Sequence, residues 1–133
     1  SSRKVYLPKP NLKENDFLRP LDNYAKNKLI TENKLKKKLN SNLLILRISN
    51  LIGPPLKKKY TRKTSKTFID NFYNFENNQV ILYENHFKDF LSKKKFFEIF
   101  FKILKVNPSG VFNVSLGKKI YINEVLNVLN KNK

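Results

Sequence analysis

The segment LLILRIS, Leu43–Ser49, constrains the fold of this chain more than any other stretch. It is a nearly continuous apolar run of strand length, and such a run is typical of a strand buried on both faces, as in a parallel sheet. Apolar and aromatic residues recur at helical spacing over 21–39, just before the run, and Pro20 with Asp22 favours a helix start there. A helix followed by a buried strand predicts an α/β architecture.

The remaining segments predict further short elements. Val5 and Tyr6 indicate the end of a short strand, and the proline-containing stretch 7–20 indicates a loop. After Gly53 the pattern predicts, in order, a basic loop at 57–66, a helix at 67–75, a strand at 80–83, a short strand or turn at 87–91, a helix at 96–106, a strand at 110–115 and a helix at 122–129.

Composition limits the class of protein. With 133 residues, of which 40% are hydrophobic, the chain can bury the core of one small domain or of a piece of a larger one. It has no cysteine, which excludes disulfides and thiolate metal sites and suits a reducing compartment such as the cytoplasm. No apolar run approaches the roughly 20 residues of a membrane span. His86 is the single histidine, so we expect it at the surface and expect no metal site.

The net charge of +18 would ordinarily indicate a nucleic-acid partner. However, lysines are spread over every segment, and the residue types with A/T-rich codons are abundant whereas Ala25 is the single alanine. We therefore attribute the charge to the base composition of the genome and expect no specific nucleic-acid partner. A basic nucleic-acid-binding module remains the alternative from another functional class, supported by the charge and the aromatic content.

Five motifs follow one another along the chain: SSRKVY, PLDNYAKNKLITE, LRISNLIGPP, KDFL and GVFNVSLGKKIYINEVL. In this order they resemble the C-terminal half of the extended short-chain dehydrogenase/reductases, the NAD-dependent epimerase/dehydratase family, with the dehydrorhamnose reductases looking close. The resemblance covers nearly the whole chain. The family's Gly-rich strand-turn-helix, which cradles the cofactor pyrophosphate, is not in the sequence. We therefore expect the chain to be a fragment that lacks the first half of the protein.

The resemblance implies an α/β fold in two parts. Residues 1–55 would form the C-terminal portion of an NAD(P)-binding Rossmann-type parallel sheet domain. Residues 56–133 would form a small α/β substrate-binding lobe, with the strand at 110–115 returning to the sheet. The cofactor would be NAD or NADP, the substrate a nucleotide-sugar, and the enzyme cytoplasmic, with no membrane partner and with a homodimer allowed. Epimerase, dehydratase and reductase outcomes share this scaffold, and a non-catalytic relative would keep the fold alone.

The resemblance also implies a catalytic unit of Ser2, Tyr24 and Lys28. Residues four apart on a helix share a face, about 5–6 Å apart at Cβ, so Tyr24 and Lys28 are expected to be neighbours. A nearby ammonium stabilises a phenolate, which could exchange a proton with a sugar hydroxyl or carbonyl while hydride moves to or from the nicotinamide. Tyr24 and Lys28 would also contact the cofactor, Lys28 through the nicotinamide ribose.

Each of these roles has a structural alternative. Tyr24 and Lys28 could be no more than the surface of a lysine-rich helix. Ser2 would orient the reacting oxygen, with Ser1 as the fallback, but a hydroxyl at the end of a strand could equally satisfy backbone groups.

The segment that follows the apolar run carries the expected ligand contacts. Ser49 is expected at the nicotinamide and Asn50 at the nucleotide-sugar, although Asn50 could be a turn residue. In KDFL, Lys88 stands where the family usually has an arginine that reaches the substrate diphosphate, and lysine lacks the bidentate fork. Asp89 is expected to brace local structure. The basic-loop residues Arg62 and Lys66 are expected to be solvated.

Overall fold

The fold is that of a computed structural model, and the structure describes residues 1–39, 42–53 and 87–131. The basic loop, helix and strand expected between 57 and 83 lie outside the described residues, as do Arg62, Lys66 and His86. No helix in the described part of the chain is long and apolar enough to cross a membrane.

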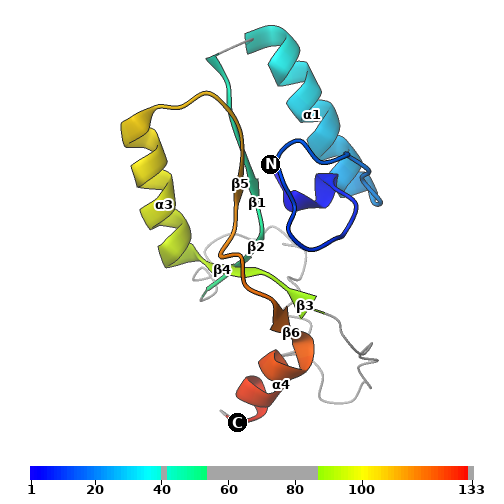
Figure 1. The fold of residues 1–133 in the computed structure, drawn as a ribbon, viewed down its shortest axis with the longest axis vertical. Helices are drawn as coiled ribbons and strands as arrows, with labels where there is room; N and C mark the ends of the chain where they lie inside the picture. Colours follow the sequence, from blue (N-terminus) through cyan, green and yellow to red (C-terminus); the bar gives the residue numbers. More distant parts are fainter. Residues whose placement is uncertain (40–41, 54–86, 132–133) are drawn as a thin grey trace, which may run out of the picture.

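A parallel pair of strands forms the centre of the structure. Strand β1 (Leu44–Ile48) pairs with β5 (Gly110–Val114), in a register that runs from Leu44 opposite Gly110 to Ile48 opposite Val114. Helix α1 (Asn23–Leu39) and helix α3 (Lys93–Val106) lie on opposite sides of this pair (Figure 1). The predicted α/β class with parallel strands is therefore confirmed.

Short strands continue the chain beyond the central pair. Strand β2 (Asn50–Ile52) pairs in parallel with β4 (Phe90–Ser92), and β3 (Phe87–Lys88) pairs antiparallel with β6 (Ile120–Tyr121). Helix α4 (Ile122–Lys131) follows β6 and lies at the end of the molecule opposite the start of β1 (Figure 1). The two short strands β3 and β4 occupy the segment predicted to be a short strand or turn. They lie just before α3 in the sequence, and α3 leads into β5.

The expected strand end is wrong for Val5, and Tyr6, whose backbone is extended, forms only an isolated antiparallel bridge with Leu18. Residues Arg3–Val5 form a 3-10 helix, η1, and Ser2 makes the strand-like parallel bridge, opposite Ile48. The backbone N–H of Val5 donates to the carbonyl of Ser2 at 3.3 Å, which turns the chain directly after Ser2. The segment from Ser2 to Tyr6 therefore makes single bridges at its two ends, with a 3-10 turn between them, rather than a strand.

Capping residues fix both long helices. Oδ1 of Asp22 accepts from the N–H of Ala25 at 2.7 Å, so α1 begins at Asn23, directly after the predicted cap. Oγ of Ser92 accepts from the N–H of Lys95 at 3.1 Å, so α3 begins at Lys93 rather than at the predicted Phe96. The aromatic face of α3 marked the helix but not its first turn.

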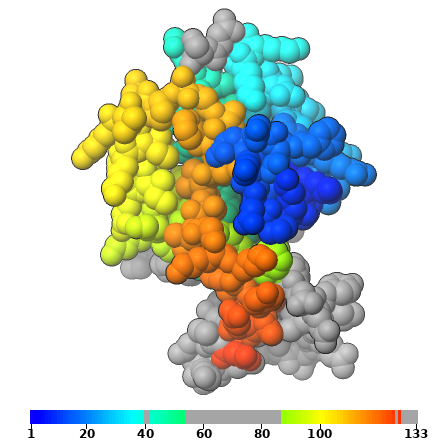
Figure 2. All heavy atoms as spheres, in the orientation of Figure 1, coloured from blue at the N-terminus to red at the C-terminus, as the bar shows by residue number. Residues whose placement is uncertain are grey.

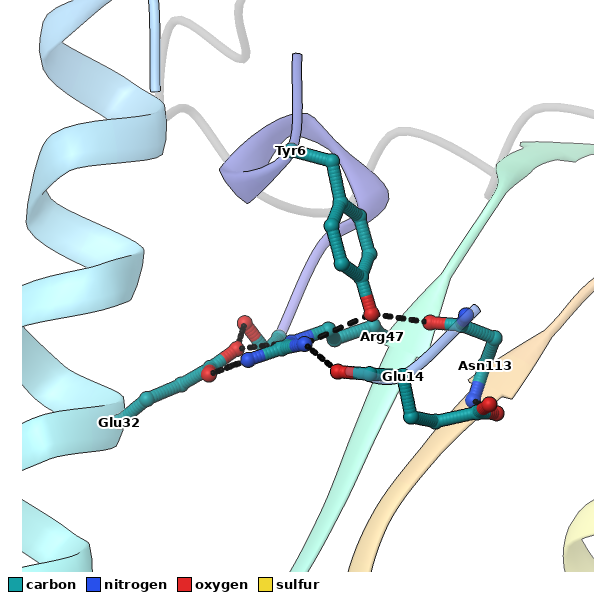
Figure 3. Close-up of polar contacts among 6 residues, drawn as sticks. Tyr6, Glu14, Glu32, Arg47 and Asn113 are labelled. Atoms are coloured by element: carbon teal, nitrogen blue, oxygen red, sulfur yellow. Dashed lines mark hydrogen bonds and ion pairs between the residues drawn. The ribbon is translucent and has the colours of Figure 1, made fainter. Parts of the chain in front are cut away.

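The buried face of β1 is centred on a charged residue. Residues Ile45 and Arg47 point to the same face of the strand and are buried, whereas the alternate residues of β1 are half-buried. Arg47 pairs with Glu32 of α1: Nη2 to Oε2 at 2.6 Å and Nε to Oε1 at 3.1 Å (Figure 3). Both side chains are at most 3% exposed. The segment predicted as a plain apolar strand therefore carries a buried ion pair.

Hydrogen bonds extend this pair to the loop and to the second strand (Figure 3). Nη1 of Arg47 donates to the hydroxyl of Tyr6 at 2.6 Å, and this hydroxyl donates to Oδ1 of Asn113 at 2.8 Å. Arg47 also donates to the carbonyl of Glu14 at 3.2 Å, and the N–H of Asn113 donates to Oε1 of Glu14 at 2.7 Å. The stretch 7–20 is a loop as predicted, but one that is fixed to both central strands.

The ion pair should make stability depend on pH. Burial raises the pKa of Glu32, but hydrogen bonds from Arg47 and Ser1 outweigh burial and hold that pKa below its ordinary 4.5. A carboxyl with a lowered folded pKa stabilises the fold fully above the unfolded value, and this stabilisation is lost as pH falls toward the folded value. The contribution of Glu32 is therefore present at neutral pH and lost below about pH 4.5.

We predict that Glu32→Gln lowers the free energy of unfolding by about 3–5 kcal/mol at pH 7, because it leaves the Arg47 guanidinium buried without its counter-charge. The variant should also lose part of the acid dependence below pH 4.5. Urea unfolding at pH 7 and pH 4 measures both effects. Glu98→Gln is the matched control, because Glu98 forms an exposed pair with Lys95. Equal effects of Glu32→Gln and Glu98→Gln would contradict the prediction.

Candidate functional site

A pocket opens where the central strands end. Ser49 directly follows β1 and Ser115 directly follows β5, and both line an open pocket of about 230 Å³. Its other walls come from the N-terminal segment and from residues 87–89. Figure 2 shows the N-terminal segment (blue) and the segment after β5 (orange) side by side on one face. Open α/β sheets bind ligands at the carboxyl ends of their strands, so this pocket is the candidate site.

The buried network holds the pocket in shape. Tyr6, Arg47 and Asn113 line the pocket and are joined to one another through the Tyr6 hydroxyl. Because Arg47 is in turn held by Glu32, helix α1 contributes to the pocket without lining it. The pocket therefore has a preformed polar wall.

The pocket is strongly basic. Its described lining includes one carboxylate, Asp89, whose oxygens accept from the N–H groups of Leu116 at 3.1 Å and Lys118 at 2.9 Å. The predicted bracing role of Asp89 is confirmed. The lining also includes the cationic residues Arg3, Lys9, Arg47, Lys88, Lys118 and Lys119. Such a site favours an anionic ligand.

The electrostatics of Arg3 and Lys88 fit this picture. Burial lowers the pKa of Arg3, and the charge of Asp89 opposes that shift. Burial also lowers the pKa of Lys88, and the positive charges of Arg3 and Lys4 lower it further. An anion in the pocket would act against both shifts, because negative charge favours the cationic forms of Arg3 and Lys88.

Two of the predicted site residues lie in the pocket. Ser49 and Lys88 both line it, and the backbone N–H of Ser49 donates to the carbonyl of Val114 at 3.0 Å. The structure thus places these two residues at the strand ends, where ligand contacts were expected. Their roles at the cofactor and the substrate stay predictions.

Tyr24 and Lys28 are neighbours, as their spacing predicted. Nζ of Lys28 lies 5.4 Å from the centroid of the Tyr24 ring. A second ammonium, Nζ of Lys4, lies 5.6 Å from the same centroid and forms an ion pair with Asp22. The ring is 54% exposed, and neither Tyr24 nor Lys28 lines the described pocket. The structure joins the pair to η1 through Lys4, and the catalytic role stays a prediction.

Ser2 and Asn50 each form a side-chain hydrogen bond to the backbone, as expected if their roles are structural. Oγ of Ser2 accepts from the N–H of Lys4 at 3.3 Å, at the start of η1. Nδ2 of Asn50 donates to the carbonyl of Asp89 at 2.9 Å, beside the pairing of β2 with β4. Neither residue lines the described pocket. These contacts leave both catalytic and binding roles as predictions.

The sequence analysis missed Arg3, Tyr6 and Asn113 as pocket residues. One signal was available for Asn113, because it interrupts the apolar residues of GVFNVS and a buried amide needs partners. For Arg3 the available signal was its position directly after Ser2, a predicted site residue. Among the described residues no group of three or more acidic, histidine or cysteine side chains could hold a metal ion.

Comparisons with known proteins bear on the fold. The sequence matches no protein-family model and no curated protein. The structure is similar to UDP-N-acetylglucosamine 4-epimerase from Methanobrevibacter ruminantium M1 in complex with UDP-N-acetylmuramic acid. The TM-score is 0.72 at 25% identity, over 98% of this chain and 44% of the epimerase. It is also similar to RMD from Pseudomonas aeruginosa complexed with NADPH, with a TM-score of 0.72 at 21% identity, over 99% of this chain and 49% of RMD.

These similarities establish that the chain shares its α/β fold with part of two larger proteins. The chain spans less than half the length of either structure. The epimerase belongs to the class of activity that the sequence motifs implied. The described residues therefore share the α/β fold of part of these two proteins, and the activity of the whole protein is a matter for proposal.

We predict that Asp89→Ala frees the segment after β5. The substitution removes the acceptor for two backbone N–H groups, so the amides of Leu116 and Lys118 should exchange with solvent roughly tenfold faster. Hydrogen–deuterium exchange measures this directly. Asp16→Ala is the control, because Asp16 accepts from the N–H of Lys13 in another loop. Unchanged exchange at Leu116 and Lys118 would show that Asp89 does not brace the segment.

Proposed function

We propose that this chain is the C-terminal portion of a longer, NAD(P)-dependent enzyme that acts on a nucleotide-sugar. The observation that carries the proposal is the similarity, over 98% of the chain, to an epimerase with a UDP-sugar bound. The similarity to NADPH-bound RMD supports the cofactor class. The basic pocket at the carboxyl ends of β1 and β5 suits the diphosphate of a nucleotide-sugar.

The residues present fit one end of a nicotinamide dinucleotide. Ser49 lines the pocket directly after β1, and Lys28 supplies an ammonium beside Tyr24. These groups would hold the nicotinamide and its ribose, and the cofactor when bound would accept or donate hydride. The chain has no Gly-rich loop for the pyrophosphate, which would have to lie in another part of the enzyme.

Tyr24 would exchange a proton with the sugar hydroxyl or carbonyl. Two ammonium groups, those of Lys4 and Lys28, lie 5.6 Å and 5.4 Å from the centroid of its ring. Ser2 would orient the reacting oxygen from the adjacent turn. Asn50 and Lys88 would contact the nucleotide-sugar, with Lys88 at the diphosphate. The choice among epimerisation, dehydration and reduction would depend on the bound sugar.

The direct test uses the protein expressed from its complete reading frame. Titration with NADH and with NADPH, followed by nicotinamide fluorescence, should show saturable binding of one or both. Incubation with UDP-N-acetylglucosamine and with other nucleotide-sugars should then reveal turnover. Failure to bind either cofactor would overturn the proposal.

Within this proposal, Tyr24→Phe should lower turnover by roughly 10²–10⁴-fold, the usual contribution of a proton-transfer group, and leave cofactor affinity nearly unchanged. Lys28→Ala should lower both turnover and cofactor affinity, because it removes a charge beside Tyr24 and a contact to the ribose. Lys28→Arg should not restore turnover, since a planar guanidinium cannot replace a compact ammonium.

Initial rates and cofactor titrations measure these effects separately. Tyr121→Phe and Lys26→Ala are matched controls: Tyr121 has no basic residue four positions later, and Lys26 is an exposed residue of α1. Near-normal turnover of Tyr24→Phe would show that Tyr24 and Lys28 are only a helix surface.

A further inference from the structure

Two buried polar groups in the pocket have no partner among the described residues: Nε of Arg3 and Oγ of Ser49. They come from neighbouring positions, because the parallel bridge sets Ser2 opposite Ile48 and each of the two residues follows one member of that bridge. Both side chains line the same pocket. The fold therefore brings two unsatisfied donors to one wall of the pocket.

Buried donors of this kind are costly unless an acceptor satisfies them, and a charged donor is the most costly. The one carboxylate in the described lining, Asp89, uses its two oxygens for the N–H groups of Leu116 and Lys118. It offsets part of the Arg3 charge through space but makes no hydrogen bond to Nε of Arg3. No group among the described residues supplies the missing acceptor, and the pocket that both residues line is the nearest space for one.

The surrounding charge specifies that this acceptor is anionic. Lys88 lines the pocket with Arg3, and the charges of Arg3 and Lys4 make its own positive charge less favourable. An anion between Arg3 and Lys88 would reduce this repulsion. A neutral acceptor would satisfy the hydrogen bonds but leave the repulsion.

We propose that Arg3 and Ser49 form an oxyanion-binding subsite beside Lys88, which takes a phosphoryl or carboxylate group. The guanidinium Nε–H and the serine hydroxyl would each donate to an oxygen of the anion, with Lys88 adding charge. As part of a nucleotide-sugar site, which rests on the proposed function, the anion is either the diphosphate or a carboxylate carried by the sugar. Arg3 then distinguishes charged from neutral groups at the same position.

Calorimetric titration of the protein from its complete reading frame, with inorganic pyrophosphate and separately with glucuronate, tests the subsite. Arg3→Gln should weaken binding of at least one probe by about tenfold to a hundredfold, the usual worth of a hydrogen bond to a charged group. Arg19→Gln removes the same charge from an exposed residue outside the pocket and should have little effect. Arg3→Lys should bind more weakly than wild type, because lysine lacks the guanidinium fork.

Ser49→Ala gives a second readout that does not depend on charge or on whether Arg3→Gln folds. It should weaken the same probe by a smaller factor. Loss confined to pyrophosphate identifies a phosphoryl subsite, and loss confined to glucuronate identifies a carboxylate subsite. Overturning results are no binding of either probe to the wild type, or equal binding by Arg3→Gln, Ser49→Ala and Arg19→Gln.

The same titrations separate this proposal from the proposed function. If pyrophosphate or glucuronate binds through Arg3 while neither NADH nor NADPH binds, the subsite stands and the enzymatic proposal fails. If a cofactor binds and the protein turns over a nucleotide-sugar while neither probe binds, the enzymatic proposal stands and the subsite fails.

Discussion

The buried ion pair between Arg47 and Glu32 is the interaction on which the rest of the described structure depends. A charged pair away from water is stable only when its geometry is good and its remaining hydrogen-bonding groups are satisfied. Here three groups of the N-terminal segment provide this, because Tyr6, the Glu14 carbonyl and Ser1 complete the pair formed by α1 and β1. None of these elements can shift without exposing or isolating a buried charge.

This constraint reaches the candidate site directly. The Tyr6 hydroxyl, which accepts from Arg47, also donates to Asn113 on β5, and both residues are part of the pocket wall. One wall of the pocket is thus a continuation of the core. A rigid polar wall of this kind favours ligand binding, since little ordering is required when the ligand arrives.

The sequence predicted the elements whose signal is local. The apolar run of β1, the strand at β5 and the i,i+4 contact of Tyr24 with Lys28 are visible in short stretches, and the structure contains all three. The 3-10 turn after Ser2 and the start of α3 were missed because each depends on a single hydroxyl cap. Arg47 within an apolar run signals that a partner is needed, but the identity of Glu32 depends on how α1 packs. The pocket residue Arg3 was missed for the same reason, because burial is a property of the tertiary structure.

The sequence separations in the buried network also have a consequence for the order of folding. Glu32 and Arg47 are 15 residues apart, whereas Tyr6 and Asn113 are 107 apart. Contacts between distant residues carry the larger entropic cost of closing a loop. We therefore expect α1 and β1 to become protected before β5 during refolding, which pulsed hydrogen exchange can follow; simultaneous protection would contradict this order. The pocket, whose wall needs Asn113, would be the last part of the described fold to take shape.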